Sequence, residues 1–379
     1  MDRIYLDNAA TTRVCPEAAQ AALEAMTTTY GNPSSTHTLG REAKALLDAS
    51  RASVAQALGC EPEALVFTSG GTESDNWAIL GAAQANARIG KHIITSQVEH
   101  DAVRKTADQL EKRGWEVTRL PPEKDGSVSV DAVAAALRED TALISLMLVN
   151  NETGAITDIH AIAGLLRSKN SRALLHTDAV QAFLKLPFQA KTLGADLISI
   201  SGHKIHAPKG VGALYVRSGL RLPALLHGGS QENGRRAGTE SVPLIAAFGA
   251  AAKAGRAHLA ESVAQMAELR AYLIERLQAE VPGILLIDGG APHILSVSLP
   301  DYKSEVLMNY LEARQIFVSK SSACKKGARS HVLEAMHLRA EQIDGTLRVG
   351  LSRYSSREDA EALVSALRSA RQELFPVLR

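Results

Sequence analysis

The sequence has few aromatic residues, almost no net charge and no long apolar run. Only 4% of its 379 residues are aromatic, and the formal net charge is +1. A charge so near zero gives no electrostatic reason to expect binding to nucleic acid or to an anionic membrane. No apolar run approaches the roughly 20 residues that span a bilayer, and the N-terminal stretch MDRIYLDNAATT lacks the basic and apolar regions of a signal peptide. We therefore expect no direct nucleic-acid or membrane partner.

Cysteine is also scarce. The chain has three cysteines, Cys15, Cys60 and Cys324, scattered along its length. This number and the missing export signal argue against a disulfide framework, so a reducing cytoplasm is the expected location. The spacing of the three matches no zinc pattern, and we predict no metal site.

What the sequence does contain is typical of an α/β protein. It is 45% hydrophobic with 28 glycines, and its length suits a large domain with a smaller one. Residues 39–58 have apolar positions at helical spacing and end at Gly59, a good helix terminator. Short apolar runs alternate with helix-like stretches and predict buried strands of a mostly parallel sheet. These runs are 64–68, 92–96, 142–149, 173–176, 197–201 and 213–216.

Polar clusters follow five of these runs. In chain order they are TSGGTES, VEH, NNETG, TDAVQ and SGHK. Ligands of open α/β sheets bind at the carboxyl ends of the strands. The five clusters therefore predict one site.

The pattern of helical and apolar stretches changes near residue 250. One long helical stretch, 242–280, leads into HILSVSLP, a helix around 304–314, the Cys324 segment, LRVGLS and a final helix from Ser356. We interpret this part as a smaller α+β domain and place the boundary at residue 250.

The stretch FTSGGTESDN predicts a strand, a glycine turn and a helix. Gly70 and Gly71 allow an anion to approach the backbone, and free N–H groups at the helix start would face it. Thr72 adds a hydroxyl group. The alternative is a tight turn in which Thr72 only caps the helix. The stretch is neither a Walker loop nor a G-x-G-x-x-G motif.

Lys204 follows an apolar run that should be a buried strand. A lysine at the end of such a strand is costly unless it is paired or used, and a desolvated amine suits a Schiff base. Ser201 and His203 beside it can donate to a phosphate. The alternative is a surface lysine at a strand end. Lys209 is a rival amine in a turn-like, more exposed context.

Other strand ends offer Asp178, His100 and Asn151. A carboxylate such as Asp178 can keep the ring nitrogen of pyridoxal phosphate protonated, and the alternative is a helix cap or an ion pair. His100 and Asn151 have structural alternatives as a satisfied histidine and a turn residue. The glycine-rich loop GGSQENGRRAGTES supplies Thr239 as a phosphate ligand, or alternatively it is only a flexible loop. Together these groups are what pyridoxal-phosphate chemistry requires.

The stretch SKSSACKKGARS places a thiol among polar residues, where free cysteine is unusual. The predicted strand-end site gives this thiol a destination, and a thiol that must reach a buried site from a polar loop cannot be fixed in a core. We therefore interpret the small residues before Cys324 as a flexible arm. Lys325, Lys326 and Arg329 then stabilise its thiolate or serve as docking charges.

Nine stretches together resemble the cysteine desulfurases of the NifS/IscS type. They are YLDNAATT, GNPSSTH, FTSGGTESDN, EHDAV, VNNETG, DAVQ, SGHKIHAPKGVGALYV, RRAGTES and SSAC, and the match spans about residues 4 to 355. The resemblance implies the fold of aspartate aminotransferase, a homodimer and pyridoxal 5′-phosphate as cofactor. It also implies a large domain of residues 13–250 and a small domain of residues 1–12 and 251–379.

The resemblance assigns roles to individual residues of this chain. Lys204 matches the Schiff-base lysine, and Cys324 the sulfur acceptor that carries a persulfide. Arg348 and Asn151 match the residues that bind the substrate carboxylate. The cofactor residues are Gly71, Thr72, Ser201 and His203 at the phosphate, Thr239 at the phosphate of the partner subunit's cofactor, Asp178 at the ring nitrogen, Gln181 at the ring hydroxyl, and His100 stacked on the ring and active in proton transfer.

The implied reaction converts L-cysteine to L-alanine and passes sulfur to an acceptor protein. Iron–sulfur cluster assembly, tRNA thiolation and other thio-cofactor pathways stay open, although SSACKKGARSHVL looks closer to shorter relatives with dedicated acceptors. One alternative is a selenocysteine lyase or another β-eliminating enzyme with the same cofactor. Another is a catalytically silent sulfur-carrier scaffold.

Overall fold

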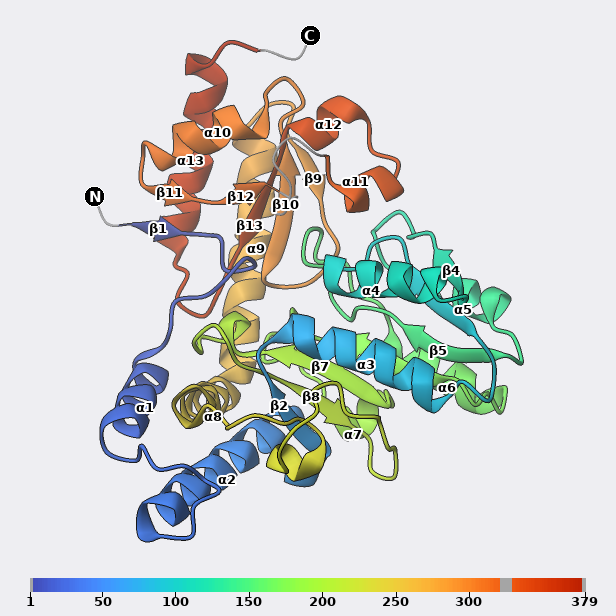
Figure 1. Cartoon of the computed structure of the whole chain (residues 1–379). Helices are drawn as coiled ribbons and strands as arrows, with labels where there is room; N and C mark the ends of the chain where they lie inside the picture. The colour runs from blue at the N-terminus through green and yellow to red at the C-terminus, as the bar shows by residue number, and fades with distance from the viewer. Residues whose placement is uncertain (1–2, 321–328, 377–379) are drawn as a thin grey trace.

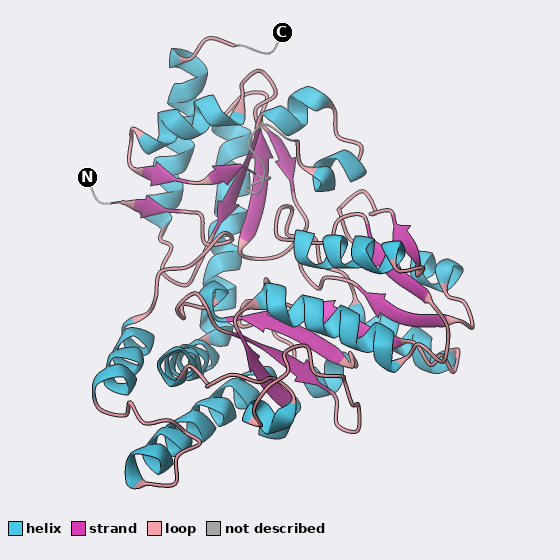
Figure 2. Ribbon diagram, in the orientation of Figure 1, coloured by secondary structure: helices cyan, strands magenta, loops and turns pink. Residues whose placement is uncertain are grey.

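The computed structural model describes residues 3–320 and 329–376 (Figure 1). Two layered parts lie side by side: a large sheet covered by helices, and a smaller sheet with helices α9, α10 and α13 beside it (Figures 1 and 2). No helix in the described part of the chain is long and apolar enough to cross a membrane.

The large sheet has seven strands in the order β2-β8-β7-β6-β5-β3-β4. Strand β8 runs antiparallel to both neighbours, and the other pairings are parallel. The predicted α/β architecture with a mostly parallel sheet is confirmed. The strands are β2 Leu65–Thr68, β3 His92–Ser96, β4 Glu116–Leu120, β5 Thr141–Ser145, β6 Leu174–Asp178, β7 Leu197–Ser201 and β8 Gly212–Val216.

Both faces of the central strands of this sheet are buried, because alternate residues of these strands point to opposite faces and enter different cores. Leu143 and Leu197 pack with Trp77 of helix α3, whereas their neighbours Ile144 and Ile198 pack on the opposite face. This explains why the strands read as continuous apolar runs rather than alternating ones. The helices of this part are α1 Pro16–Thr27, α2 Thr38–Leu58, α3 Gly71–Ala85, α4 Asp101–Lys112, α5 Val130–Ala136, α6 Ile159–Ser168, α7 Ala190–Leu193 and α8 Val242–Ala257.

The second part is built on a four-stranded antiparallel sheet, β12-β13-β10-β9. Its strands are β9 Leu285–Ile287, β10 Ile294–Ser298, β12 Ser319–Lys320 and β13 Thr346–Gly350. The N-terminal strand β1 Ile4–Tyr5 pairs with β11 Ile316–Phe317. The helices are α9 Leu259–Glu280, α10 Ser304–Glu312, α11 His331–Ala335, α12 Ala340–Asp344 and α13 Arg357–Glu373.

Two features differ from the sequence-based expectations. Strand β4 was not predicted, because its exposed or half-buried polar residues hide the strand pattern at the edge of the sheet. The single helical stretch 242–280 is two helices, α8 and α9, which meet at His258. Helix α8 contributes Ala252 to the first core, and α9 contributes Met266 to the second. The domain bounds 13–250 and 1–12 with 251–379 stay a prediction.

Candidate active site

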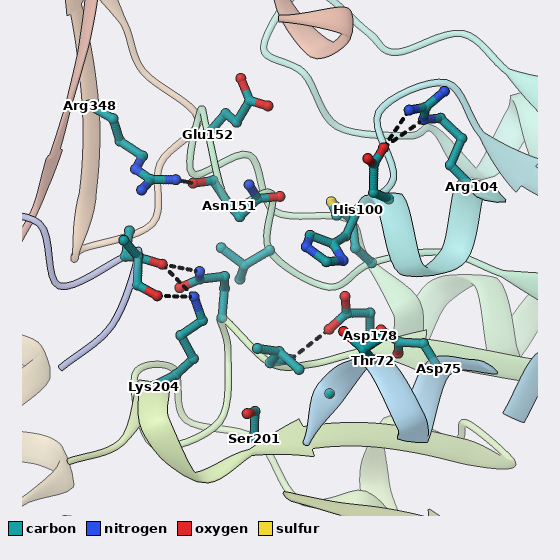
Figure 3. Close-up of a pocket in the computed structure, with 18 of the residues that line it drawn as sticks. Thr72, Asp75, His100, Arg104, Asn151, Glu152, Asp178, Ser201, Lys204 and Arg348 are labelled. Carbon is teal, nitrogen blue, oxygen red and sulfur yellow. Dashed lines mark hydrogen bonds and ion pairs between the residues drawn. The ribbon is translucent and has the colours of Figure 1, made fainter. Parts of the chain in front are cut away.

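The segments that follow β2, β3, β5, β6 and β7 meet at one cavity. These five strands point the same way, so their carboxyl ends share an edge of the sheet. The cavity has a volume of about 600 Å³. The predicted site residues that line it are Gly71, Thr72, His100, Asn151, Asp178, Gln181, Ser201, His203, Lys204 and Arg348 (Figure 3).

Lys204 lies at the end of the 3₁₀ turn Gly202–Lys204 that directly follows β7. Its Nζ donates to the carbonyl oxygens of Ala9 at 2.7 Å and Ala10 at 2.8 Å. The N-terminal segment, almost 200 residues away in sequence, therefore holds the amine at the cavity (Figure 3). The rival Lys209 is exposed and lines only a neighbouring hollow.

The start of helix α3 forms the second element of the site. Gly70 has a φ of +150°, which favours glycine, and Gly71 opens the helix. Free N–H groups at a helix start attract anions. A hollow of about 340 Å³ beside this turn is lined by Gly70, Gly71, Thr72, Ser201 and other residues, His203 and Lys209 among them. The arrangement suits a phosphate group.

Asp178 ends strand β6 and is buried at the cavity. Its Oδ1 accepts a hydrogen bond from the Val180 amide at 2.9 Å. Burial raises its pKa, and the nearby His100 and Lys204 oppose that shift. A carboxylate in this position is best satisfied by a cationic ligand.

Asp75 is a site residue that the sequence analysis missed. It lies one turn into α3, at the position four residues after Gly71. Burial and the neighbouring Asp178 raise its pKa well above the usual value, and its Oδ1 has no hydrogen-bond donor among the described residues. Ligand-type atoms of Asp75, His100 and Asp178 lie within 4.8 Å of one another. The helical spacing from Gly71 is the signal in the sequence that could have identified Asp75.

His100 caps helix α4, and its ring lies over the cavity (Figure 3). Nδ1 accepts from the Ala102 amide at 3.1 Å, so the neutral ring carries its proton on Nε2. Gln181 is buried and donates from Nε2 to the Ala9 carbonyl at 2.8 Å. Its Oε1 is buried without a hydrogen-bond donor in the described residues, which leaves an acceptor for a ligand hydroxyl.

Arg348 on β13 brings the smaller sheet to the cavity. Nη1 donates to the Asn151 carbonyl at 2.9 Å, and Nη2 donates to Ser319 Oγ at 2.8 Å and to Asp7 Oδ1 at 3.1 Å. Its Nε is buried and unpaired among the described residues. The guanidinium group is thus fixed and has a donor left for an anionic ligand.

Glu152, also missed from the sequence, follows Asn151 in the same loop. It is 5% exposed, and burial raises its pKa to about 7. Its Oε2 accepts from Ser330 Oγ at 2.5 Å. The contact joins the large-sheet loop to the start of α11. The turn-like pattern NNETG gave no sign that this carboxyl is buried.

One predicted residue, Thr239, is not among those that line the cavity, and another, Cys324, lies outside the described residues. Thr239 is exposed in the loop before α8 and is absent from the lining. Cys324, with the neighbouring Lys325 and Lys326 and the arm expected before it, lies outside the described residues. Arg329, expected to stabilise the thiolate or to dock a partner, lines the cavity and pairs with Asp344 at 2.8 Å.

Comparisons with known proteins agree with this geometry. The family model Aminotransferase class-V matches residues 4–363. "Cysteine desulfurase IscS" of Methanosarcina thermophila is 44% identical over 378 residues, which cover 98% of this chain and 92% of the relative. A solved "NifS-like protein" has a TM-score of 0.93 and 34% identity, and the match covers 98% of this chain and 100% of the other.

A second solved structure, "SspA in complex with cysteine", has a TM-score of 0.81 and 32% identity, with coverage of 94% of this chain and 100% of the other. Each of these likenesses extends over nearly the whole chain, and so includes both sheets and the cavity. The chain therefore belongs to the class-V aminotransferase family and, within it, to the cysteine desulfurases of the NifS/IscS type.

Proposed function

We propose that this protein converts L-cysteine to L-alanine and holds the released sulfur as a persulfide on Cys324. Enzymes of this family depend on pyridoxal 5′-phosphate. The observation that carries the proposal is the meeting of Lys204, Asp178, the Gly71–Thr72 turn and Arg348 at one cavity. These groups match an amine, a ring-nitrogen partner, a phosphate cradle and a carboxylate anchor.

The residues of the cavity fit the cofactor. Asp178 is a buried carboxylate that suits a protonated ring nitrogen, and the unpaired Oε1 of Gln181 suits the ring hydroxyl. Lys204 would bind the cofactor covalently, and His100 would stack on its ring. Gly71, Thr72, Ser201 and His203 would hold the phosphate, with Thr239 supplied from a second copy of the chain. When bound, the cofactor withdraws electrons from the substrate α-carbon.

The protein residues perform the remaining work. Arg348 and Asn151 orient the carboxylate of L-cysteine, and Lys204 removes the α-proton. The Cys324 thiolate attacks the substrate sulfur, so that an S–S bond forms as the Cβ–S bond breaks. Protonation at Cβ and return of a proton from Lys204 to Cα, with His100 taking part in the proton transfers, then yield alanine.

The wider setting is part of the proposal. The enzyme acts as a homodimer, because the assignment of Thr239 to the cofactor phosphate of the partner subunit needs a second subunit. Its location in this proposal is the cytoplasm. The persulfide sulfur passes to an acceptor protein in iron–sulfur cluster assembly, tRNA thiolation or another thio-cofactor pathway. The surface of the enzyme, rather than its cavity, selects that acceptor protein.

The test compares wild type, Cys324→Ser and the control Cys60→Ser with L-cysteine and a thiol reductant. Alanine, sulfide and protein-bound persulfide are measured. We expect Cys324→Ser to lose activity by about 100-fold or more, because the nucleophile is gone. Cys60 is half-buried and does not line the cavity, so its variant should match wild type.

Unimpaired alanine formation by Cys324→Ser would remove Cys324 from the mechanism. Pyruvate and ammonia in place of alanine would instead indicate β-elimination. Turnover of L-selenocysteine by both proteins, with no persulfide from L-cysteine, would favour a selenocysteine lyase. A protein that binds no cofactor under these conditions would be a carrier scaffold.

A further inference from the structure

Lys185 is a buried lysine that the proposed reaction does not use. It lies after strand β6, in the turn between that strand and α7, and is only 4% exposed. Its Nζ has no hydrogen-bond partner among residues 3–320 and 329–376. An amine in this condition is costly to bury, so its position needs an explanation.

Lys185 and Lys204 line the same small cavity, which has a volume of about 20 Å³. Lys204 also lines the large cavity, so it separates the two spaces. The small cavity holds about one water molecule. Its walls include Ser262 and Met266 of α9 and Ser352, which follows β13. Lys185 thus approaches Lys204 from the side away from the substrate.

The charges around Lys185 are all of one sign. Burial, and after it the positive charges of Lys204 and Arg348, lower the pKa of Lys185 to about 7. Arg353 lines the small cavity as well. None of the described carboxylates opposes these effects on the Lys185 amine. Lys185 therefore lacks the counter-ion that would make it a structural ion pair.

Three imidazoles near the two lysines are held neutral. Burial is the main cause that lowers the pKa of His203 and His206 to about 4, and Lys185 adds to both shifts. The pKa of the fully buried His293 is lowered by burial and then by Lys185 and Lys204. A hydrogen bond with the Gln181 backbone opposes the lowering of the His293 pKa. These neutral rings thus supply no negative charge to the Lys185 amine.

Packing alone does not explain a lysine here, because an apolar side chain of similar length would fill the space without the cost of an unpaired amine. A second cationic group beside a reactive lysine favours the uncharged form of that lysine. We propose that Lys185 is a positioning residue for Lys204 that keeps the nitrogen of Lys204 uncharged by placing a second amine without a counter-ion in the same small cavity. This inference rests on the proposed role of Lys204 as the cofactor lysine.

The test uses the holoenzyme and the variants Lys185→Met and Lys185→Arg. Lys191→Met is the control. Lys191 lies near Lys185 in the sequence, but its side chain is exposed and pairs with Glu61. The pH-dependent absorption of the bound cofactor reports whether the Lys204 nitrogen carries a proton. We expect the midpoint of that titration to rise by about half a unit or more in Lys185→Met, because a neighbouring positive charge is lost.

The order of midpoints should be Met above Lys above Arg at position 185, since arginine keeps its charge at every pH used. The control should match wild type. An unchanged midpoint in Lys185→Met would overturn the inference. If Lys204→Ala kept the same cofactor absorption as wild type, the proposed function would be overturned instead. The two failures are therefore distinguishable.

A second measurement follows the stability of the folded protein against pH. Free lysine releases its proton near pH 10.5, whereas Lys185 releases it at about 7 in the folded protein. Between these values the unfolded chain binds more protons, so this group makes wild-type stability rise with pH. The stability advantage of Lys185→Met should therefore be largest below pH 7 and shrink up to pH 10.5. A constant difference would show that Lys185 has a counter-ion and would overturn the inference.

Discussion

Two buried carboxyls, Asp75 and Asp178, lie beside one imidazole at the cavity, and two amines, Lys185 and Lys204, share a small space behind it. Like charges meet within each pair, and His100 and Lys204 oppose the rise in the Asp178 pKa. The carboxyls raise each other's cost of ionisation, and the amines do the same for protonation. The side chains are therefore arranged for a charged ligand that enters between them.

The variant Lys204→Ala tests whether Lys204 is the lysine that binds the cofactor covalently. We expect the variant to lose the absorption band of covalently bound cofactor, because no other described amine lies at the large cavity. The matched control is Lys209→Ala, which removes an exposed lysine from the adjacent hollow. Absorption spectra after incubation with pyridoxal phosphate and desalting give the answer. A band that persists in Lys204→Ala and disappears in Lys209→Ala would transfer the role to Lys209.

Strands β2, β8 and β7 hold the phosphate side of the cavity together. Gly212 on β8 lies between Thr68 of β2 and Ser201 of β7. A Cβ atom at this position would be 2.6 Å from the Ile200 carbonyl oxygen and 2.8 Å from the Gly70 Cα. Only glycine therefore lets the strand pass so close to the turn that opens helix α3.

Gly212→Ala should destabilise the protein by about 1–3 kcal/mol, because the contacts are with backbone that cannot rotate away. It should also weaken cofactor retention, since Gly70 and Ser201 must shift. Gly164→Ala on α6 is the control, because the added Cβ meets nothing closer than 3.8 Å. In a helix, that change should stabilise by about 0.5–1 kcal/mol. Denaturant unfolding and cofactor titration measure both; equal effects of the two variants would contradict the expectation.

The elements themselves were largely predictable. The apolar runs 92–96 and 197–201 are the strands β3 and β7 with the same bounds, and Gly59 ends α2 in the left-handed conformation. Strand β4 was missed because an edge strand needs less apolar surface than a central one. The break at His258 was missed because apolar residues continue through it, and only the packing of α8 and α9 in different cores separates them.

The N-terminal segment connects a core of the smaller sheet with a core of the large sheet near the site. Leu6 packs in the smaller core, whereas Ala9 packs in the larger one. Asp7 between them accepts from Arg348 and from Ser319 at 2.7 Å. The cavity therefore depends on the docking of the two sheets, because residues of both line it.

Global stability should depend on pH through Glu99. Burial raises its pKa to about 8, whereas the ordinary value is 4.5. Between these values the folded protein binds the extra proton, so this group makes stability fall as pH rises from 4.5 to 8. Glu99→Gln removes the titration, so the stability of the variant relative to wild type should improve over that range.

Denaturant unfolding between pH 5 and pH 8.5 measures this difference. Glu123→Gln is the control, because Glu123 is exposed, and its difference from wild type should be flat. A flat difference for Glu99→Gln would show that Glu99 is ionised throughout. The hydrogen bonds that its Oε1 accepts, from Ser96 Oγ and from the Met147 amide, can be kept by the glutamine carbonyl.

The sequence by itself determined the strand-end clusters, the α/β class, and the residues Lys204, Asp178 and His100, because each follows a local pattern of apolar and polar residues. Only the tertiary structure placed Ala9 and Ala10 on the Lys204 amine, Asp7 on Arg348, and Lys185 behind Lys204. These contacts join segments that the chain separates by 19 to more than 300 residues. No local pattern encodes them, since they arise when the two sheets pack and their buried charges must share one space.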